Sequence, residues 1–214
     1  MKINLQHITP DAELEIVRIA RVSSPRQDKD AEPEKLIRYL IDHKHWSPFE
    51  MANMCIEIEC TIASSIQILR HRSLSFQQFS QRYASVMQAS EVLQPVTFYY
   101  QDESKNRQMS TDQLFDNSEL LKRVESIQAE TIQLYQELLD AGCSRETARY
   151  ILPMNTTTRL YANGTIRSWI HYSQSRLDQR HVQPEHYELA CRIAKIFKEQ
   201  LPTIYKACRF PENY

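Results

Sequence analysis

The chain is most distinctive at Arg70-His71-Arg72-Ser73-Leu74-Ser75-Phe76-Gln77-Gln78-Phe79-Ser80-Gln81-Arg82. This segment, 70–82, holds three arginines, one histidine, three serines and two adjacent glutamines, but no acidic residue. Guanidinium groups bind phosphate and carboxylate in a bidentate manner, and hydroxyl and amide groups complete the hydrogen bonds around such an anion. The alternative is a solvated basic helix face, which usually carries Glu or Asp at i±4, and this segment lacks them. We therefore expect an anion-binding site here.

The composition of the whole chain is that of an ordinary globular protein. Hydrophobic residues make up 42% of the 214 residues and charged residues 25%. This length suits one domain, 1–214, with a polar loop or insertion near 101–117. The net charge of −1 disfavours a dedicated nucleic-acid-binding protein, because such proteins are normally basic.

The cysteines and histidines do not suggest disulfides or a metal site. Five cysteines are an odd number and form no CxxC pair, and His43 and His45 lack a third ligand nearby. We see no apolar leader at the N-terminus and no apolar run near ~18 residues. These observations predict a soluble cytoplasmic protein with buried, unpaired cysteines, no bound metal and no contact with a membrane.

Glycine is scarce, and this excludes two common nucleotide-binding loops. The chain has two glycines, Gly142 and Gly164, so neither GxGxxG nor a Walker loop can form. If the protein binds a nucleotide cofactor, side chains and helix ends must hold it. The arginine-rich segment gains importance for this reason.

The first half of the chain predicts two helices, a strand and a third helix. Apolar spacing favours helices over 11–22 and 33–43, and alternation over Cys55–Cys60 indicates a half-buried strand. Thr61 is suited to cap a helix with Ile62, Ile66 and Leu69 facing inward. On that helix, Gln67, Arg70 and His71 would share one face, so the anion site would open at the helix C-terminal end.

The second half predicts a strand over 92–100 and a long helix near 118–141, which Gly142 would end. The apolar face of this helix, which includes Tyr135, suits a core or a subunit contact. Ser144 would cap a short helix that holds Arg149 and stops at Pro153. A strand over 156–161 and helices over 165–177 and 184–200 follow.

Three further cationic side chains are candidates for binding an anion. Arg149 lies in an apolar stretch, where it either extends to solvent along the surface or binds an anion. Arg167 and His171 share one helix face, although a lone histidine is usually a core group. Arg176 lies about half a turn around that helix from Arg167, at ~100° per residue. Both can serve one pocket if the helix bends or if pockets lie between subunits, which points to an oligomer.

The spacing Arg-His-Arg, seven residues, then Ser (70–72 and 80) resembles the signature of the flavin-dependent thymidylate synthases, the ThyX family. Five segments, one of which contains this signature, match that family in order and spacing, so the resemblance covers most of the chain: Ala20–Ser23, His45–Glu50, Ala63–Tyr83, Ala148–Pro153 and Thr165–Glu185. It implies an α+β fold with a mixed or antiparallel sheet and flanking helices. It also implies a homotetramer with active sites shared between subunits.

The resemblance further implies reductive methylation of dUMP to dTMP, with FAD as cofactor, NADPH as reductant and 5,10-methylenetetrahydrofolate as carbon donor. By position, Arg176 is the expected catalytic residue, polarising the uracil base. The expected FAD contacts are Ser47, Glu50, Arg70, His71, Arg72, Gln78, Thr165, Ile166, Arg167 and His171. The expected dUMP contacts are Gln67, Ile68, Leu69, Arg70, Gln78, Phe79, Ser80, Gln81, Arg82, Arg149 (from another subunit) and Arg176.

The chain departs from the family pattern at three places. Gln78 replaces a common Glu, Thr165 and His171 replace common Asn residues, and the stretch Leu177–Arg180 is one residue longer, which shifts His181. Two alternative functions remain open: a flavoprotein of this fold with another acceptor, and a non-catalytic nucleotide- or RNA-binding module whose affinity falls steeply with salt.

Overall fold

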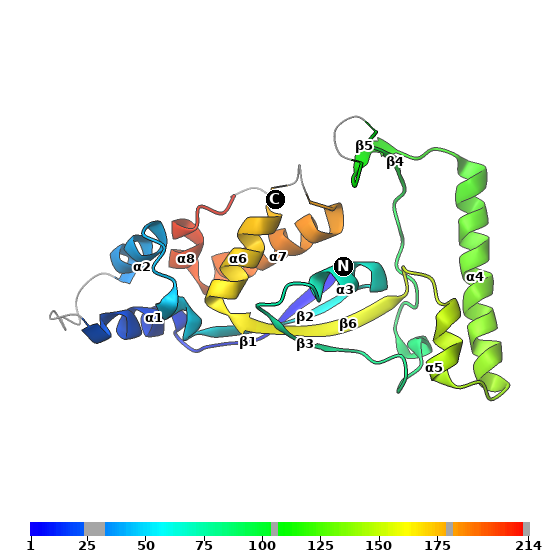
Figure 1. Cartoon of the computed structure of the whole chain (residues 1–214), viewed down its shortest axis with the longest axis horizontal. Coiled ribbons are helices and arrows are strands. Elements are labelled where there is room, and N and C mark those ends of the chain that lie inside the picture. The colour runs from blue at the N-terminus through cyan, green and yellow to red at the C-terminus, as the bar shows by residue number, and fades with distance from the viewer. Residues whose placement is uncertain (24–32, 104–106, 179–181, 212–214) are drawn as a thin grey trace. The chain divides into compact units, whose positions relative to one another are not determined.

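The structure, a computed structural model, describes residues 1–23, 33–103, 107–178 and 182–211. It is a mixed α+β fold with a four-stranded sheet in the order β1-β2-β6-β3 and an antiparallel pair, β4 and β5 (Figure 1). The strands are β1 (Lys2–Ile8), β2 (Asn53–Thr61), β3 (Ser75–Gln78), β4 (Tyr99–Gln101), β5 (Ser110–Leu114) and β6 (Thr157–Thr165). The α-helices are α1 (Ala12–Ala20), α2 (Pro33–Asp42), α3 (Ile62–Ile68), α4 (Ser118–Asp140), α5 (Arg145–Ala148), α6 (Ile166–Arg176), α7 (Pro184–Gln200) and α8 (Pro202–Ala207). Short 3₁₀ turns are η1 (Arg21–Ser23), η2 (Ser47–Glu50), η3 (Val86–Gln88) and η4 (Arg149–Ile151).

The chain divides into two compact units. Unit 1 comprises Met1–Ile58, Ile68–Gln77 and Leu160–Tyr214, and unit 2 comprises Glu59–Gln67 and Gln78–Arg159. Within the part of the chain that the structure describes, no helix is long and apolar enough to cross a membrane.

Unit 1 has its core between its strands and the helices α6 and α7, which lie on the same face of the strands (Figure 1). Met54 and Ile56 of β2 are fully buried, as is Phe197 of α7. Trp169 of α6, only 1% exposed, donates a hydrogen bond from Nε1 to the carbonyl oxygen of Met54 at 2.8 Å. This bond satisfies the indole N–H inside the core and fixes α6 against β2.

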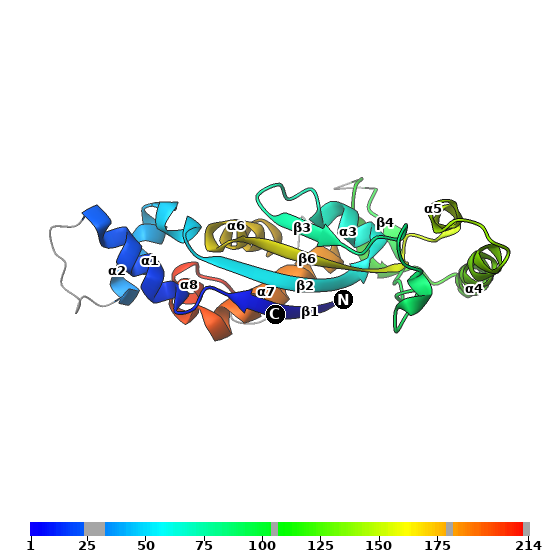
Figure 2. The ribbon, with the colours of Figure 1, turned by 90° about the horizontal axis from the view of Figure 1, so that it is seen from below.

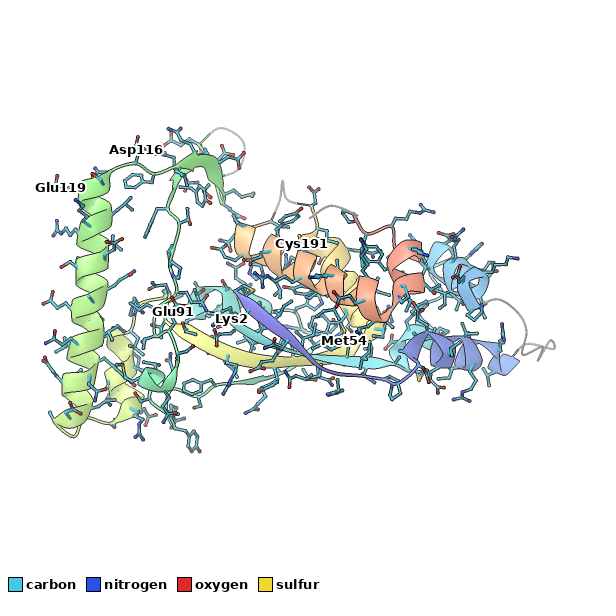
Figure 3. All side chains as sticks on the ribbon, turned by 180° about the vertical axis from the view of Figure 1, so that it is seen from behind. Lys2, Met54, Glu91, Asp116, Glu119 and Cys191 are labelled. Atoms are coloured by element: carbon cyan, nitrogen blue, oxygen red, sulfur yellow. The ribbon has the colours of Figure 1, made fainter. Side chains whose placement is uncertain are left out.

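Unit 2 is built around α4. Figure 2 shows α5 beside α4, and the two helices are in contact. Tyr135 is the fully buried residue of α4, where it packs in a cluster with Val86 and Ala148. Asp116, labelled in Figure 3, precedes α4 and accepts a hydrogen bond from Tyr100 Oη at 2.6 Å.

Most predicted elements are present, and local signals explain their ends. The predicted helices over 11–22, 33–43, 165–177 and 184–200 correspond to α1, α2, α6 and α7, and the Cys55–Cys60 strand is part of β2. Thr61 caps α3, since its Oγ1 accepts the Ser64 N–H at 3.1 Å. Gly142 follows α4 with φ +88°, a left-handed conformation that glycine adopts without strain.

In the middle of the chain, the strand prediction is largely wrong, and a further strand is present. The strand expected over 92–100 is reduced to a bridge at Leu93 and to Tyr99–Gln101, because the backbone bonds that Gln94 and Phe98 form, to Asn155 and Phe115, are single ones and do not extend into a ladder. The stretch 101–117, predicted as a polar loop or insertion, contains strand β5, which pairs with β4. Gln101 Nε2 stabilises this hairpin by donating to the Met109 carbonyl oxygen at 2.8 Å.

Two predictions about α3 also need correction. Ile66 is 49% exposed, whereas Ser64, Ser65 and Ile68 are buried, so the inward face is not the predicted apolar one. The serine hydroxyls can be buried because they have hydrogen-bond partners. The helix ends at Ile68, so Arg70 and His71 follow it and do not share its face with Gln67. Strands β1 and β3 and helix α8 were not predicted.

Gly164 of β6 allows Leu74 to approach closely. A Cβ at position 164 would lie 2.3 Å from Leu74 Cδ2, and Leu74 is only 6% exposed. We expect Gly164→Ala to lower the free energy of unfolding by about 1–3 kcal/mol, measured by urea denaturation, because the core must move to admit the methyl group. In a Leu74→Ala background the same change should cost much less, and an equal cost would contradict this explanation.

Candidate active site

Unit 1 contains a cavity of about 700 Å³, and most of the residues that line it have polar or charged side chains of both signs. Four of the predicted FAD contacts are in its wall: Glu50, Thr165, Arg167 and His171. Six residues that were not among the predicted FAD contacts also line it, although Ser73 lies within the predicted anion-binding segment 70–82: Lys44, Trp46, Ser73, Ser168, Ile170 and Gln174. Their signal in the sequence was weak, because Lys44 and Trp46 lie in a short turn and Ser168 and Gln174 are ordinary helix residues.

The N-terminus of α6 positions two of these cavity residues. Thr165 caps the helix, with its Oγ1 accepting the Ser168 N–H at 3.2 Å. Helical spacing from this cap places Arg167 and His171 on one face, as predicted. Arg167 forms an ion pair with Glu50 of η2, so the two segments meet at the cavity. Both side chains are partly exposed, which limits the pair's contribution to stability.

Two further predicted FAD contacts, Ile166 and Ser47, differ in exposure: Ile166 is buried and Ser47 is exposed. Ile166 has no exposed surface, and its N–H is bonded to the Ala52 carbonyl oxygen at 2.8 Å. Its side chain therefore belongs to the core of unit 1. Ser47 begins η2, the same turn that carries Glu50.

The three side chains of the Arg-His-Arg segment, 70–72, differ in their exposure to solvent. Arg70 and Arg72 are exposed, while His71 is half-buried and its Nε2 is buried without a hydrogen-bond partner among the described residues. The His71 ring lies 5.0 Å from the Tyr172 ring and 5.7 Å from the His171 ring. Burial, followed by the fields of His171 and Arg176, lowers the pKa of His71. We infer that His71 is neutral near pH 7 and can offer a hydrogen bond to a ligand.

Arg176 ends α6 close to this histidine and to a second one. Its guanidinium carbon lies 6.0 Å from the Tyr172 ring centroid, and its Nε is buried without a partner among the described residues. His186, 2% exposed, lies within the field of Arg176, and neither ring nitrogen has a partner in the described chain. Burial and then Arg176 lower the pKa of His186 to about 4. No pattern in the sequence indicated a role for His186, because it lies in a regular helical repeat.

Gln78, the last residue of β3, belongs to unit 2. Gln78 donates from Nε2 to Ser65 Oγ at 3.0 Å and to Thr158 Oγ1 at 3.2 Å. Phe79 packs against the Val86 cluster. The sequence did not single out Ser65 or Thr158, because their partner is distant along the chain.

The other predicted nucleotide contacts of unit 2 are surface or half-buried groups. Arg82 forms an exposed ion pair with Glu146 at 2.9 Å, and Gln81 Nε2 is buried without a partner among the described residues. Arg149 lies in η4, after α5, where its Nε donates to the Glu146 carbonyl oxygen at 3.1 Å. The neighbouring Ser80 is exposed.

The predicted residues thus fall into two groups. Unit 1 holds the expected FAD contacts apart from Gln78, together with Ile68, Leu69 and Arg176; unit 2 holds Gln67, Gln78–Arg82 and Arg149. A second cavity, of about 280 Å³, lies in unit 2 and is lined in part by Phe79, Glu59 and Arg159. His181, whose match was shifted by the longer stretch, lies outside the described residues.

The cysteines are unpaired, and burial makes several of them unreactive. Burial raises the pKa of the Cys60 and Cys208 thiols to about 12. Neither is a thiolate near pH 7, so neither is suited to be a nucleophile. Within the described ranges, no group of three or more His, Cys, Asp or Glu side chains is arranged to hold a metal ion.

The fold and the site define a class: a mixed α+β protein with a cavity lined largely by polar and charged residues and a cluster of histidine and arginine nitrogens beside it. The chain belongs to the thymidylate synthase complementing protein family, whose model matches residues 4–203. It is 45% identical over 198 residues to the flavin-dependent thymidylate synthase of Synechocystis, covering 90% of this chain and 87% of that protein. It is 42% identical over 199 residues to a probable flavin-dependent thymidylate synthase of Paramecium bursaria Chlorella virus 1, covering 92% and 90%.

A solved structure agrees with this family membership. The fold is similar to that of a UMP/dUMP methylase, PolB from Streptomyces cacaoi, whose crystal structure contains 5-Br dUMP. The TM-score is 0.82 at 26% sequence identity, over 96% of this chain and 93% of that one.

Proposed function

We propose that this chain is a flavin-dependent thymidylate synthase that converts dUMP to dTMP, with FAD as cofactor, NADPH as reductant and 5,10-methylenetetrahydrofolate as carbon donor. Family membership and the names of its relatives support the activity. The observation that carries the proposal is the cavity of unit 1, whose wall holds Lys44 and the Arg167–Glu50 pair among polar side chains, since every one of these ligands is an anion that such groups can bind.

The residues of unit 1 fit FAD. A volume of about 700 Å³ lies within the usual range of ligand pockets, roughly 300–1,000 Å³. Lys44 offers positive charge for a pyrophosphate, as would Arg167 on exchanging Glu50 for the ligand, and Trp46 and His171 offer flat faces for ring systems. The buried, unpartnered Nε2 of His71 is a further polar group that a ligand can satisfy. Ser47, Glu50, Arg70, Arg72 and Thr165 would complete this set.

Arg176 would act on the nucleotide base. FAD, when reduced, supplies the hydride for this chemistry. Arginine stays protonated, so it cannot serve as a base, but it can stabilise negative charge that develops on the uracil ring. Gln67, Gln78–Arg82 and Arg149 would hold the rest of dUMP, and dUMP is the nucleotide named for the similar methylase.

We also propose that the 214 residues act as one functional domain in a cytoplasmic homotetramer. The support for assembly is a row of exposed apolar residues on α4 at seven-residue spacing, Leu120, Ile127 and Leu134. Arg149 would then serve a neighbouring subunit. Five unpaired cysteines suit a reducing compartment.

An absorbance spectrum of the purified protein tests the cofactor. We expect flavin bands, either as purified or after incubation with FAD and removal of free flavin. A protein that stays colourless after reconstitution contradicts the proposal. If such a protein binds RNA with an affinity that falls steeply with salt, the nucleic-acid-binding alternative replaces it.

A further inference from the structure

The single hydroxyl hydrogen of Ser65 is already used in a hydrogen bond. It lies on α3 with no exposed surface, and its Oγ donates to the Ile62 carbonyl oxygen at 2.8 Å. A carbonyl oxygen only accepts hydrogen bonds, so the hydroxyl hydrogen must point toward Ile62. Any other polar atom in contact with Ser65 Oγ must therefore bring its own hydrogen.

Gln78 provides that hydrogen. Its Nε2 lies 3.0 Å from Ser65 Oγ and 3.2 Å from Thr158 Oγ1, and both hydroxyl residues are at most 2% exposed. The amide nitrogen has two hydrogens, one for each oxygen. The contact with Ser65 thus requires the Gln78 amide to present its nitrogen, Nε2, to Ser65. The amide oxygen, Oε1, then points away from Ser65.

We propose that Ser65 is a positioning residue that holds the Gln78 amide with Oε1 toward bound dUMP, as a neutral acceptor for a hydroxyl or N–H group of the nucleotide. This inference rests on the proposed function for the identity of the ligand. A carboxylate at position 78 would place an oxygen against Ser65 Oγ with no hydrogen between them, which is repulsive. Ser65 therefore favours glutamine over glutamate at position 78.

The experiment is a double-mutant cycle between positions 65 and 78. The dUMP affinity of the FAD-loaded protein is measured by calorimetry for the unmodified chain, Gln78→Glu, Ser65→Ala and the double variant. We expect Gln78→Glu to weaken dUMP binding about tenfold in the unmodified chain, the size of one mispaired polar contact. In the Ser65→Ala background the loss should be under about threefold, because the repulsive oxygen is gone and Thr158 can donate to the carboxylate.

Gln77→Glu is the matched control. It introduces the same charge at the adjacent, exposed position of β3, so dUMP affinity should stay within about twofold. Equal losses from Gln78→Glu in both backgrounds, or no loss in either, would overturn the positioning role of Ser65.

Urea unfolding of the same four proteins separates this inference from the proposed function. Gln78→Glu should lower the denaturant midpoint in the unmodified chain and have a smaller effect in Ser65→Ala. If the unmodified chain binds no dUMP, the proposed function and the identity of the ligand are wrong, while the unfolding cycle still decides whether Ser65 fixes the orientation of the Gln78 amide. A midpoint shift that is equal in both backgrounds overturns it.

Discussion

Arg176→Ala is expected to keep flavin bound while the rate of dTMP formation falls by about 10²–10³-fold, the usual cost of losing one charge-stabilising donor. Arg176 lies beside Tyr172, and its field reaches two histidines near the end of α6. Loss of its charge would leave negative charge on the uracil ring uncompensated. Steady-state NADPH oxidation and product analysis measure the rate, and the flavin absorbance band reports cofactor binding.

Two variants separate this role from a general loss of structure. Arg176→Lys retains a positive charge and should recover part of the activity, although lysine lacks the planar fork of arginine. Arg192→Ala removes an exposed arginine that pairs with Glu188 on α7, and it should leave the rate unchanged. Full activity of Arg176→Ala would show that charge stabilisation by this side chain is not part of the reaction.

The second large effect is on stability in acid. Because burial and Arg176 lower the pKa of His186 from 6.5 to about 4, the unfolded chain takes up a proton at a higher pH than the folded chain. The contribution to stability is therefore complete above pH 6.5 and is lost as the pH falls toward 4. We expect the unfolding free energy to fall by about 3 kcal/mol over this interval through His186.

His186→Leu should remove most of this pH dependence, as measured by urea denaturation at pH 7, 5.5 and 4. A smaller slope should persist, because the pKa of His71 is lowered as well. Cys191→Ala, on the same helix, removes packing without removing a group that titrates in this interval, so it should retain the full slope. An unchanged slope in His186→Leu would mean that His186 is not the source.

Local signals in the sequence predicted much of the fold. Thr61 marks the start of α3 because its Oγ1 accepts the Ser64 N–H, and Gly142 marks the end of α4 because glycine, which lacks a Cβ, adopts a left-handed conformation without strain. Alternation over β2 predicted its burial, since Ile56 and Ile58 are inside while Glu57 is not. The predicted anion site also rests on a local signal, because it depends on arginines without acidic residues within 70–82.

The features that the sequence did not reveal depend on partners distant along the chain. Nothing near Ser65 indicates that it is buried in preference to Ile66, because Gln78 and Thr158 complete its surroundings. The hairpin of β4 and β5 was missed for a related reason, since polar residues such as Gln101 stabilise it through backbone oxygens. His186 becomes distinctive only when folding brings it within the field of Arg176.

The most direct test is transfer of labelled carbon from 5,10-methylenetetrahydrofolate to dUMP by the purified, FAD-loaded protein with NADPH. We predict labelled dTMP, with no product when dUMP, the folate or NADPH is omitted. A yellow protein that oxidises NADPH but forms no labelled dTMP under these conditions would contradict thymidylate synthesis as its activity.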